Sequence, residues 1–209
     1  MQEKKSRGTL FIVSAPSGAG KTTLCKKIVS ILPNLKFSVS YTTRQKRKGE
    51  INGKDYKFIS REKFKQMIDE GEFIEWAEIY EEFYGSSKKT IEELLSLGVD
   101  VLLDIDTQGA MQIKKKYKEG AYIFVLPPSL DVLKERLEKR KTDSKEEIEK
   151  RLRKSISEIK NYQMYDYVII NNKLEDALKE FEAIIISQRI STKIINPLWV
   201  EKKFFKSRR

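Results

Sequence analysis

The sequence contains no histidine, and it contains a single cysteine, Cys25. Without histidine, Ser-His-Asp and Cys-His catalysis are excluded, and the commonest protein ligands of transition metals are missing. One cysteine cannot form an internal disulfide or a cysteine-rich zinc site, and we interpret Cys25 as a packing residue. Carboxylates, lysine and arginine, hydroxyl groups and a hard cation such as Mg²⁺ remain for any chemistry.

Long apolar runs are also missing. No run approaches the roughly 20 residues that a membrane-spanning helix needs. Residues 1–8 are polar, and the apolar run at 10–13 is too short for the core of a secretory signal. We therefore expect a cytoplasmic protein with no membrane partner.

Acidic residues are fewer than basic ones. The chain has 42 Lys and Arg against 31 Asp and Glu, a formal net charge of +11 at pH 7. This sign indicates a polyanionic partner, either nucleic acid or nucleotides. No basic patch interleaved with aromatic residues supports specific nucleic-acid binding. Residues 201–209 hold five of the basic residues and one acidic residue, and we expect this tail to be solvated.

The apolar residues, 39% of 209, suffice for one core. Short apolar runs predict buried strands at 10–13, 99–105, 121–126 and 167–170. Further strands are predicted at 36–41 and 56–59, and at 73–80 and 83–84 in a small antiparallel lobe. Helices are predicted at 21–32, 90–97, 130–141 and 176–190, from Ser60, and from a capping box that begins at Ser144. Buried strands that alternate with helices predict an α/β fold, with a parallel sheet covered on both faces.

A glycine-rich turn follows the first predicted strand and leads into a helix. It reads Ser14-Ala15-Pro16-Ser17-Gly18-Ala19-Gly20-Lys21-Thr22. Backbone N–H groups at a helix start lack partners within the helix, and the helix dipole favours negative charge there, so the turn suits a polyphosphate. In this pattern Lys21 reaches the β- and γ-phosphates and the Thr22 hydroxyl ligates Mg²⁺. Ala15 stands where the general pattern has glycine.

Two later stretches carry polar groups in settings that suggest a ligand. Arg44 and Arg47, followed by Tyr56, could clamp a phosphate, because guanidinium groups match phosphate oxygens bidentately; a basic loop of this kind is, on its own, more often solvated. Glu75 lies in the aromatic, apolar stretch 73–77. A carboxylate there needs hydrogen-bond donors, and the N1–H and N2–H₂ edge of guanine offers two.

Six segments together resemble the guanylate kinase family, whose members phosphorylate GMP. They are 14–21 (Ser-Ala-Pro-Ser-Gly-Ala-Gly-Lys), 42–44 (Thr-Thr-Arg), 52–56 (Asn-Gly-Lys-Asp-Tyr), 73–77 (Phe-Ile-Glu-Trp-Ala), 84–86 (Tyr-Gly-Ser) and 103–109 (Leu-Asp-Ile-Asp-Thr-Gln-Gly). The resemblance covers residues 8 to about 190. Bacterial members commonly have alanine at the position of Ala15, whereas Asn172 stands where the family often has aspartate.

The resemblance implies a P-loop NTPase fold with an inserted mixed α+β lobe for GMP and a helical lid. It implies a core of residues 1–35, 97–130 and 158–190, a lobe of 36–96 and a lid of 131–157. The basic extension, 191–209, lies outside it. The implied substrates are GMP, with dGMP also expected, and MgATP, handled by a monomer or homodimer.

The resemblance also implies the site residues. Those for ATP are Ala15, Pro16, Ser17, Gly18, Ala19, Gly20, Lys21, Thr22, Thr23, Arg136, Arg140 and Asn171. Those for GMP are Ser40, Arg44, Arg47, Tyr56, Glu75, Tyr84, Ser86 and Asp106. The catalytic cations would be Lys21, Arg44, Arg136, Arg140 and Arg151. Thr22 and, through water, Asp104 would hold Mg²⁺.

Three other interpretations remain open at this stage. An inactive interaction module of the same family typically lacks the phosphate loop and its lysine, both of which this chain keeps. A kinase for another nucleoside monophosphate is disfavoured by Glu75 with Ser40, because adenine lacks the paired donors. The residues alone favour a solvent-exposed helix in which Arg136, Arg140 and Arg151 form salt bridges. Only the resemblance favours a lid.

Overall fold

The computed structural model describes residues 7–79, 81–117, 119–139 and 145–205. Its strands are β1 (Leu10–Ser14), β2 (Leu35–Phe37), β3 (Tyr41–Thr42), β4 (Lys57–Phe58), β5 (Phe73–Ile79), β6 (Glu82–Ser87), β7 (Asp100–Asp104), β8 (Ala121–Leu126) and β9 (Tyr167–Ile170). Its α-helices are α1 (Lys21–Ile31), α2 (Arg61–Asp69), α3 (Lys88–Ser96), α4 (Thr107–Lys116), α5 (Leu130–Glu138), α6 (Lys145–Ile159), α7 (Leu174–Arg189) and α8 (Pro197–Val200).

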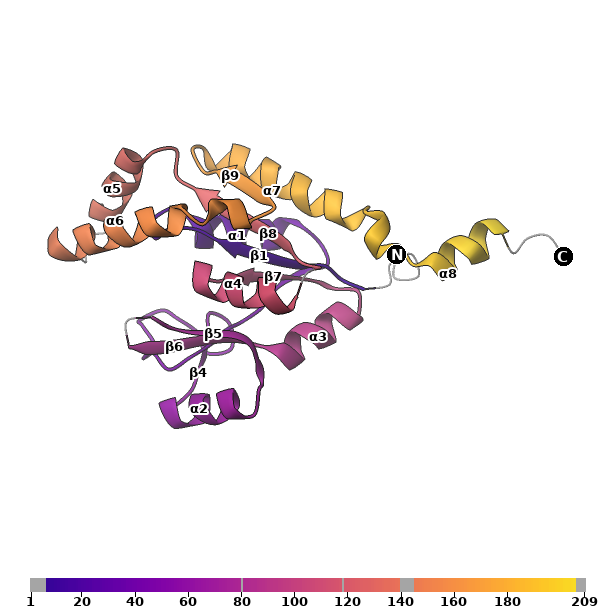
Figure 1. The fold of residues 1–209 in the computed structure, drawn as a ribbon, viewed down its shortest axis with the longest axis horizontal. Coiled ribbons are helices and arrows are strands. Elements are labelled where there is room, and N and C mark those ends of the chain that lie inside the picture. The colour runs from indigo at the N-terminus through magenta and orange to yellow at the C-terminus, as the bar shows by residue number, and fades with distance from the viewer. Residues whose placement is uncertain (1–6, 80, 118, 140–144, 206–209) are drawn as a thin grey trace.

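Two sheets organise the molecule. Five strands form a parallel sheet in the order β2-β7-β1-β8-β9, and four form a smaller sheet in the order β4-β3-β6-β5. In the smaller sheet β3 runs parallel to β4 and antiparallel to β6. Figure 1 shows the smaller sheet with α2 below the large sheet, and α5 with α6 at one end of the molecule. The predicted α/β fold with a parallel sheet flanked by helices is confirmed.

The central strands β1, β7 and β8 of the large sheet are buried on both faces, which explains why they are apolar runs rather than alternating ones. The strand predicted as buried at 167–170 is the edge strand β9, where Val168 and Ile170 are exposed. All five residues of the central strand β1 are buried. Helices α1 and α7 cover one face, packing residues such as Cys25 and Phe181 against it, and α3 and α4 cover the other, with Ile91 and Ile113. The lobe has a separate aromatic core around Phe64, where the Phe64 and Phe73 rings stack 4.5 Å apart.

Side-chain caps set where several helices begin. Ser60, Ser87 and Ser129 each accept a hydrogen bond from the backbone N–H three residues on, at the starts of α2, α3 and α5. Asp106 does the same for α4 through the Gly109 N–H. Such a cap satisfies a donor that the helix itself leaves unpaired.

The structure differs from the predicted elements in two places. The strand predicted at 36–41 is two strands in different sheets: the Ser38 N–H still donates to Leu102 of β7, whereas the Ser40 carbonyl accepts from Lys57, the first residue of β4. The alternation of apolar and polar residues continues through this stretch, although the chain passes from the large sheet to the smaller one. Helix α4 was not predicted at all. The capping box at Ser144 lies outside the described residues.

Beyond α7 the chain forms short helical pieces. A 3₁₀ turn at Thr192–Ile194 precedes α8, and a π-helical turn at Glu201–Phe205 follows it. In Figure 1, α8 stands beyond the end of α7, away from the layers around the sheet. Across the part of the chain described here, no helix has both the length and the apolar character needed to cross a bilayer.

Candidate active site

The phosphate loop connects β1 to α1, and two glycines determine its shape. Gly20 occupies the N-cap position of α1, where no side chain caps the helix. Gly18 and Gly20 have φ of 94° and 89°, a region that other residues rarely adopt. A Cβ on Gly20 would also lie 2.4 Å from Asn171 Nδ2. The loop therefore leads into a helix whose first N–H groups lack partners within the helix, at the positive end of its dipole, which suits an anion.

Lys21 and Thr22 both contact the end of β7. Lys21 Nζ lies 2.6 Å from Asp104 Oδ1 and donates to the Ile105 carbonyl at 2.6 Å. The Thr22 hydroxyl donates to Asp104 Oδ2 at 2.9 Å. Burial lowers the pKa of Lys21, but Asp104 outweighs it and the net pKa is raised, so the lysine is charged. A cation, a hydroxyl and a carboxylate thus meet where the loop enters α1.

Asn171 and Arg136 support the loop. The buried Asn171 amide donates to the Ala19 carbonyl at 2.7 Å. Arg136 of α5 donates to the Asn171 carbonyl at 3.0 Å and reaches the same Ala19 carbonyl at 3.4 Å. These bonds hold the Ala19 carbonyl of the loop in place.

Helix α6 closes one side of the loop. A cavity of about 310 Å³ is lined by loop residues together with Asp106, Arg151, Lys154 and Glu158. The buried Ser155 hydroxyl donates to the Ser17 carbonyl at 3.5 Å. Burial raises the pKa of Glu158, and this is opposed by Lys154 and by a hydrogen bond from the Ser17 N–H. Arg140, predicted to act beside Arg136 and Arg151, lies outside the described residues.

A second cavity, of about 280 Å³, joins the loop to the lobe. It is lined by Lys21, Thr22, Ser40, Tyr56, Glu75, Ala77, Ile79, Tyr84, Asp104, Ile105 and Asp106. Eight of the residues predicted from the sequence are therefore gathered around one space. Ser86 adjoins it, because its hydroxyl lies 3.3 Å from that of Ser40.

Glu75 is the buried carboxylate of this cavity, with 5% of its surface exposed. It pairs with Ser86 across β5 and β6. A Cβ on Gly109 would lie 2.6 Å from Glu75 Oε2, so any side chain there would force the carboxylate to move. Burial raises the pKa of Glu75 to about 7, with a further rise from Asp106 and an opposing hydrogen bond from Ser86. A buried carboxylate shifted this far is typical of a functional site.

Arg44 lies at the outer side of the lobe cavity, beside two tyrosines. Its guanidinium stands 5.4 Å from the centre of the Tyr56 ring, and the Tyr56 and Tyr84 rings are 5.9 Å apart. Glu50 binds both terminal nitrogens of Arg44, at 2.7 and 3.1 Å. The side chain of Arg47 is exposed, and its backbone N–H donates to Glu50 at 2.8 Å.

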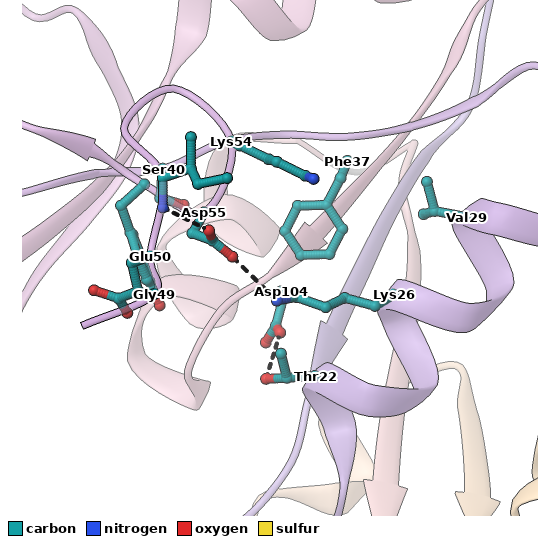
Figure 2. Close-up of a pocket in the computed structure, with 12 residues that line it drawn as sticks. Thr22, Lys26, Val29, Phe37, Ser40, Gly49, Glu50, Lys54, Asp55 and Asp104 are labelled. Carbon is teal, nitrogen blue, oxygen red and sulfur yellow. Dashed lines mark hydrogen bonds and ion pairs between the residues drawn. The ribbon is translucent and has the colours of Figure 1, made fainter. Parts of the chain in front are cut away.

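A larger cavity, of about 690 Å³, opens between α1 and the lobe (Figure 2). Lys26 reaches across it from α1 to Asp55 of the lobe, with Nζ and Oδ1 3.2 Å apart. On its floor Thr22 faces Asp104, and Phe37 and Val29 form its apolar side. Helix α1 and the lobe are therefore separated by open space on this side and bridged by the Lys26–Asp55 ion pair.

Sequence reasoning missed several residues of the site. Glu50, Ser155 and Glu158 were given no role, although Glu50 lies inside the segment that carries the arginines. Its spacing from Arg44 could have suggested a pair. Ser155 and Glu158 gave no usable signal, because a serine and a glutamate in a charged helix read as solvent-facing residues.

Comparison with known proteins agrees with this geometry. The guanylate kinase family model matches residues 7–188. The chain is 50% identical over 188 residues to the guanylate kinase of Geobacter metallireducens, covering 90% of this chain and 93% of that protein. It is 48% identical over 196 residues to that of Clostridioides difficile, covering 94% and 96%.

A solved structure gives the same result. The crystal structure of guanylate kinase from Anaplasma phagocytophilum superposes with a TM-score of 0.79 at 34% identity, covering 97% of this chain and 98% of that one. The family model and relatives of this identity extend over most of the sequence. The chain therefore belongs to the guanylate kinase family.

Proposed function

We propose that the chain transfers the γ-phosphoryl group of ATP to GMP, giving ADP and GDP, and that dGMP is also accepted. The observation that carries the proposal is the 280 Å³ cavity, in which the loop residues Lys21 and Thr22 share one space with the buried carboxylate of Glu75. A base held at Glu75 would place its phosphate toward Arg44, Tyr56 and the loop.

Guanine fits the donor and acceptor set of the lobe cavity. Ionised Glu75 accepts two hydrogen bonds, from N1–H and N2–H₂, and Ser40 donates to O6. Ser86 and Asp106 complete the polar wall. An adenine would leave the carboxylate unpaired in a buried position, which is costly.

The transfer itself needs charge and position rather than a strong base. The acceptor is an anionic phosphate oxygen, so this chain's task is to align two phosphates and to neutralise charge on the transferring group. Lys21 supplies a cation from the loop, Arg44 and Arg47 hold the acceptor phosphate with Tyr56 and Tyr84, and Arg136, Arg140 and Arg151 act from the lid. The loop residues 15–23, including Pro16 and Thr23, enclose the donor phosphates, with Asn171 behind them.

The residues at the loop fit a magnesium ion. Thr22 and Asp104 present a hydroxyl and a carboxylate 2.9 Å apart, and hard oxygen donors of this kind, few in number, suit Mg²⁺ carried on a nucleotide. Thr22 and Asp104, the latter through water, would hold it. When bound, Mg²⁺ neutralises charge on the donor phosphates.

The division into core, lobe and lid follows from these roles. Residues 36–96 bind the acceptor, residues 131–157 cover the donor phosphates, and closure of both excludes water and so suppresses ATP hydrolysis. The intact loop and its paired lysine argue against an inactive module. The oligomeric state and the cytoplasmic location remain predictions.

The deciding experiment is a coupled ADP-release assay with MgATP and, in turn, GMP, dGMP, IMP, AMP, UMP and TMP. We expect turnover with GMP and dGMP, weak turnover with IMP, which lacks N2–H₂, and none with the others. Equal turnover with AMP and GMP would refute the guanine assignment. No turnover with any acceptor, in a folded protein that still binds GMP, would favour the module.

A further inference from the structure

The segment 191–209, which we call the basic arm, exposes large apolar side chains that the fold does not cover. Leu198, Phe204 and Phe205 are 68%, 67% and 72% exposed. The rings of Trp199 and Phe204 meet edge to face, 6.0 Å apart. The match to the family model ends at residue 188, before the arm begins. Exposed apolar groups gathered on one short segment usually mark an interaction site.

The arm is also strongly basic. It holds six of the 42 Lys and Arg and one of the 31 Asp and Glu, so it carries +5 of the net +11 and leaves +6 on residues 1–190. Lys202 and Lys203 lie in the π-helical turn and are exposed beside the phenylalanines. The partner must therefore offer both negative charge and an apolar interior.

We propose that the basic arm binds an anionic lipid surface, with Leu198, Phe204 and Phe205 entering the headgroup region and the lysines pairing with lipid phosphates. Clusters of four to eight basic residues next to exposed aromatic and aliphatic groups are the pattern of such peripheral contacts. A second copy of the chain fits less well, because its body is itself basic and repels the arm. A nucleic acid would attract the lysines but has no complement for Leu198.

The position of the arm is compatible with catalysis at a surface. Lys193 and Ile194, at its root, line a cavity with Gly8, Ala121 and Tyr167, which lie at the amino ends of β1, β8 and β9. The phosphate loop follows the carboxyl end of β1. An enzyme held by its arm would thus keep the site at the opposite edge of the sheet accessible. Such contact is peripheral and needs no membrane-spanning helix.

The test is co-sedimentation of the full chain with vesicles of equal phosphatidylglycerol and phosphatidylcholine, and with phosphatidylcholine alone. We expect binding to the anionic vesicles only, weakening as salt rises. Lys202→Gln with Lys203→Gln should lower the partition coefficient about 25-fold, at about fivefold for each charge. The matched control, Lys63→Gln with Lys65→Gln on α2, removes the same charge elsewhere on the surface and should change it little.

A second variant separates apolar insertion from charge. Phe204→Ser with Phe205→Ser keeps every charge and should also weaken binding. In a Trp76→Phe background, the fluorescence of Trp199 should shift to the blue when anionic vesicles are added. ADP release by each variant, without vesicles, checks that it is folded.

Four results would overturn the proposal. The first is no binding to anionic vesicles at low salt, and the second is an equal loss of binding in the arm and α2 variants. The third is self-association of the chain that depends on the arm and excludes vesicles. The fourth is binding of single-stranded RNA in preference to vesicles. The second result would mean that the chain adsorbs to the vesicles through its overall net charge rather than through the arm. The last two would assign the arm to another copy or to nucleic acid.

Discussion

The carboxylate of Glu50 holds the guanidinium of Arg44 through both oxygens, at 2.7 and 3.1 Å, and the same carboxylate accepts from the Arg47 backbone at 2.8 Å. One acidic residue therefore fixes the Arg44 side chain and the Arg47 backbone, the two arginines that we propose hold the acceptor phosphate. A bidentate pair of this kind fixes the plane of the guanidinium as well as its place.

Glu50→Gln should therefore raise KM for GMP by about tenfold, because a charge-assisted hydrogen bond contributes about 1.5 kcal/mol or more. KM for ATP and kcat should change little. Steady-state kinetics with each substrate varied in turn measures this split. Asp69→Asn, an exposed carboxylate of the same lobe, is the control. A loss in kcat alone would mean that Glu50 does not act through acceptor binding.

Lys21→Ala should abolish phosphoryl transfer and leave the fold intact. In the proposed function its charge acts on the transferring group, which would contribute several kcal/mol to stabilising the transition state. Lys27→Ala, an exposed lysine on the same helix, should keep normal turnover in the ADP-release assay. If Lys21→Ala turns over within about tenfold of the parent, a loss under about 1.4 kcal/mol, the assigned role is wrong.

Glu75 should make both stability and GMP binding depend on pH, in opposite directions. Its pKa is about 7 in the fold against 4.5 in an unfolded chain, so the folded state holds the extra proton between these values. Stability without ligand should therefore fall as pH rises from about 4.5 to 7 and level off above. GMP affinity should rise over the same range, because guanine needs the ionised form.

Glu75→Gln separates these two effects. The variant should lose GMP activity by about 10²-fold or more, since an amide donor then faces the donors of the base. At pH 8 without ligand it should be more stable than the parent, by up to about 3 kcal/mol, and its melting temperature should vary less between pH 5 and 8. A variant that keeps full GMP preference would show that Glu75 is a packing residue.

Asn171→Ala should weaken ATP binding by about five- to tenfold, because the Ala19 carbonyl loses its 2.7 Å donor and the loop loosens. The loss should be equal for ATP and for inorganic tripolyphosphate, which has no base. Asn172→Ala, the exposed neighbour, should bind both normally. A loss confined to ATP would instead place Asn171 against the adenine.

The fold class was predictable because buried parallel strands are continuous apolar runs, and 121–126 coincides with β8. Helix α4 was not predicted because its buried face depends on Ala110 and Ile113, which pack on the sheet, while Gly109 and three lysines weaken the helical pattern of apolar residues. The break between β2 and β3 was not predicted because the alternation of apolar and polar residues does not show which sheet supplies the neighbouring strand.

The functional site, like the fold, was predictable from the sequence only in part. Motifs at the loop, at Arg44 and at Glu75 located residues that the structure brings together around the loop and the lobe. They did not reveal supporting contacts such as Ser155 with Ser17, because these join segments far apart in the chain through ordinary polar side chains. Only the three-dimensional arrangement shows which serine of a charged helix is buried.

The pairing of β1 has a consequence for the order of folding. Leu10 pairs with Val101 of β7 and Phe11 with Ala121 of β8, whereas Ile79 pairs with Glu82 in the neighbouring strand of the β5–β6 hairpin. Closing a long loop costs more entropy than closing a short one, and distant pairings form slowly. The hairpin of the lobe should thus form early. The strand that carries the phosphate loop gains its neighbours last, so nucleotide binding should appear only with the slowest phase of refolding.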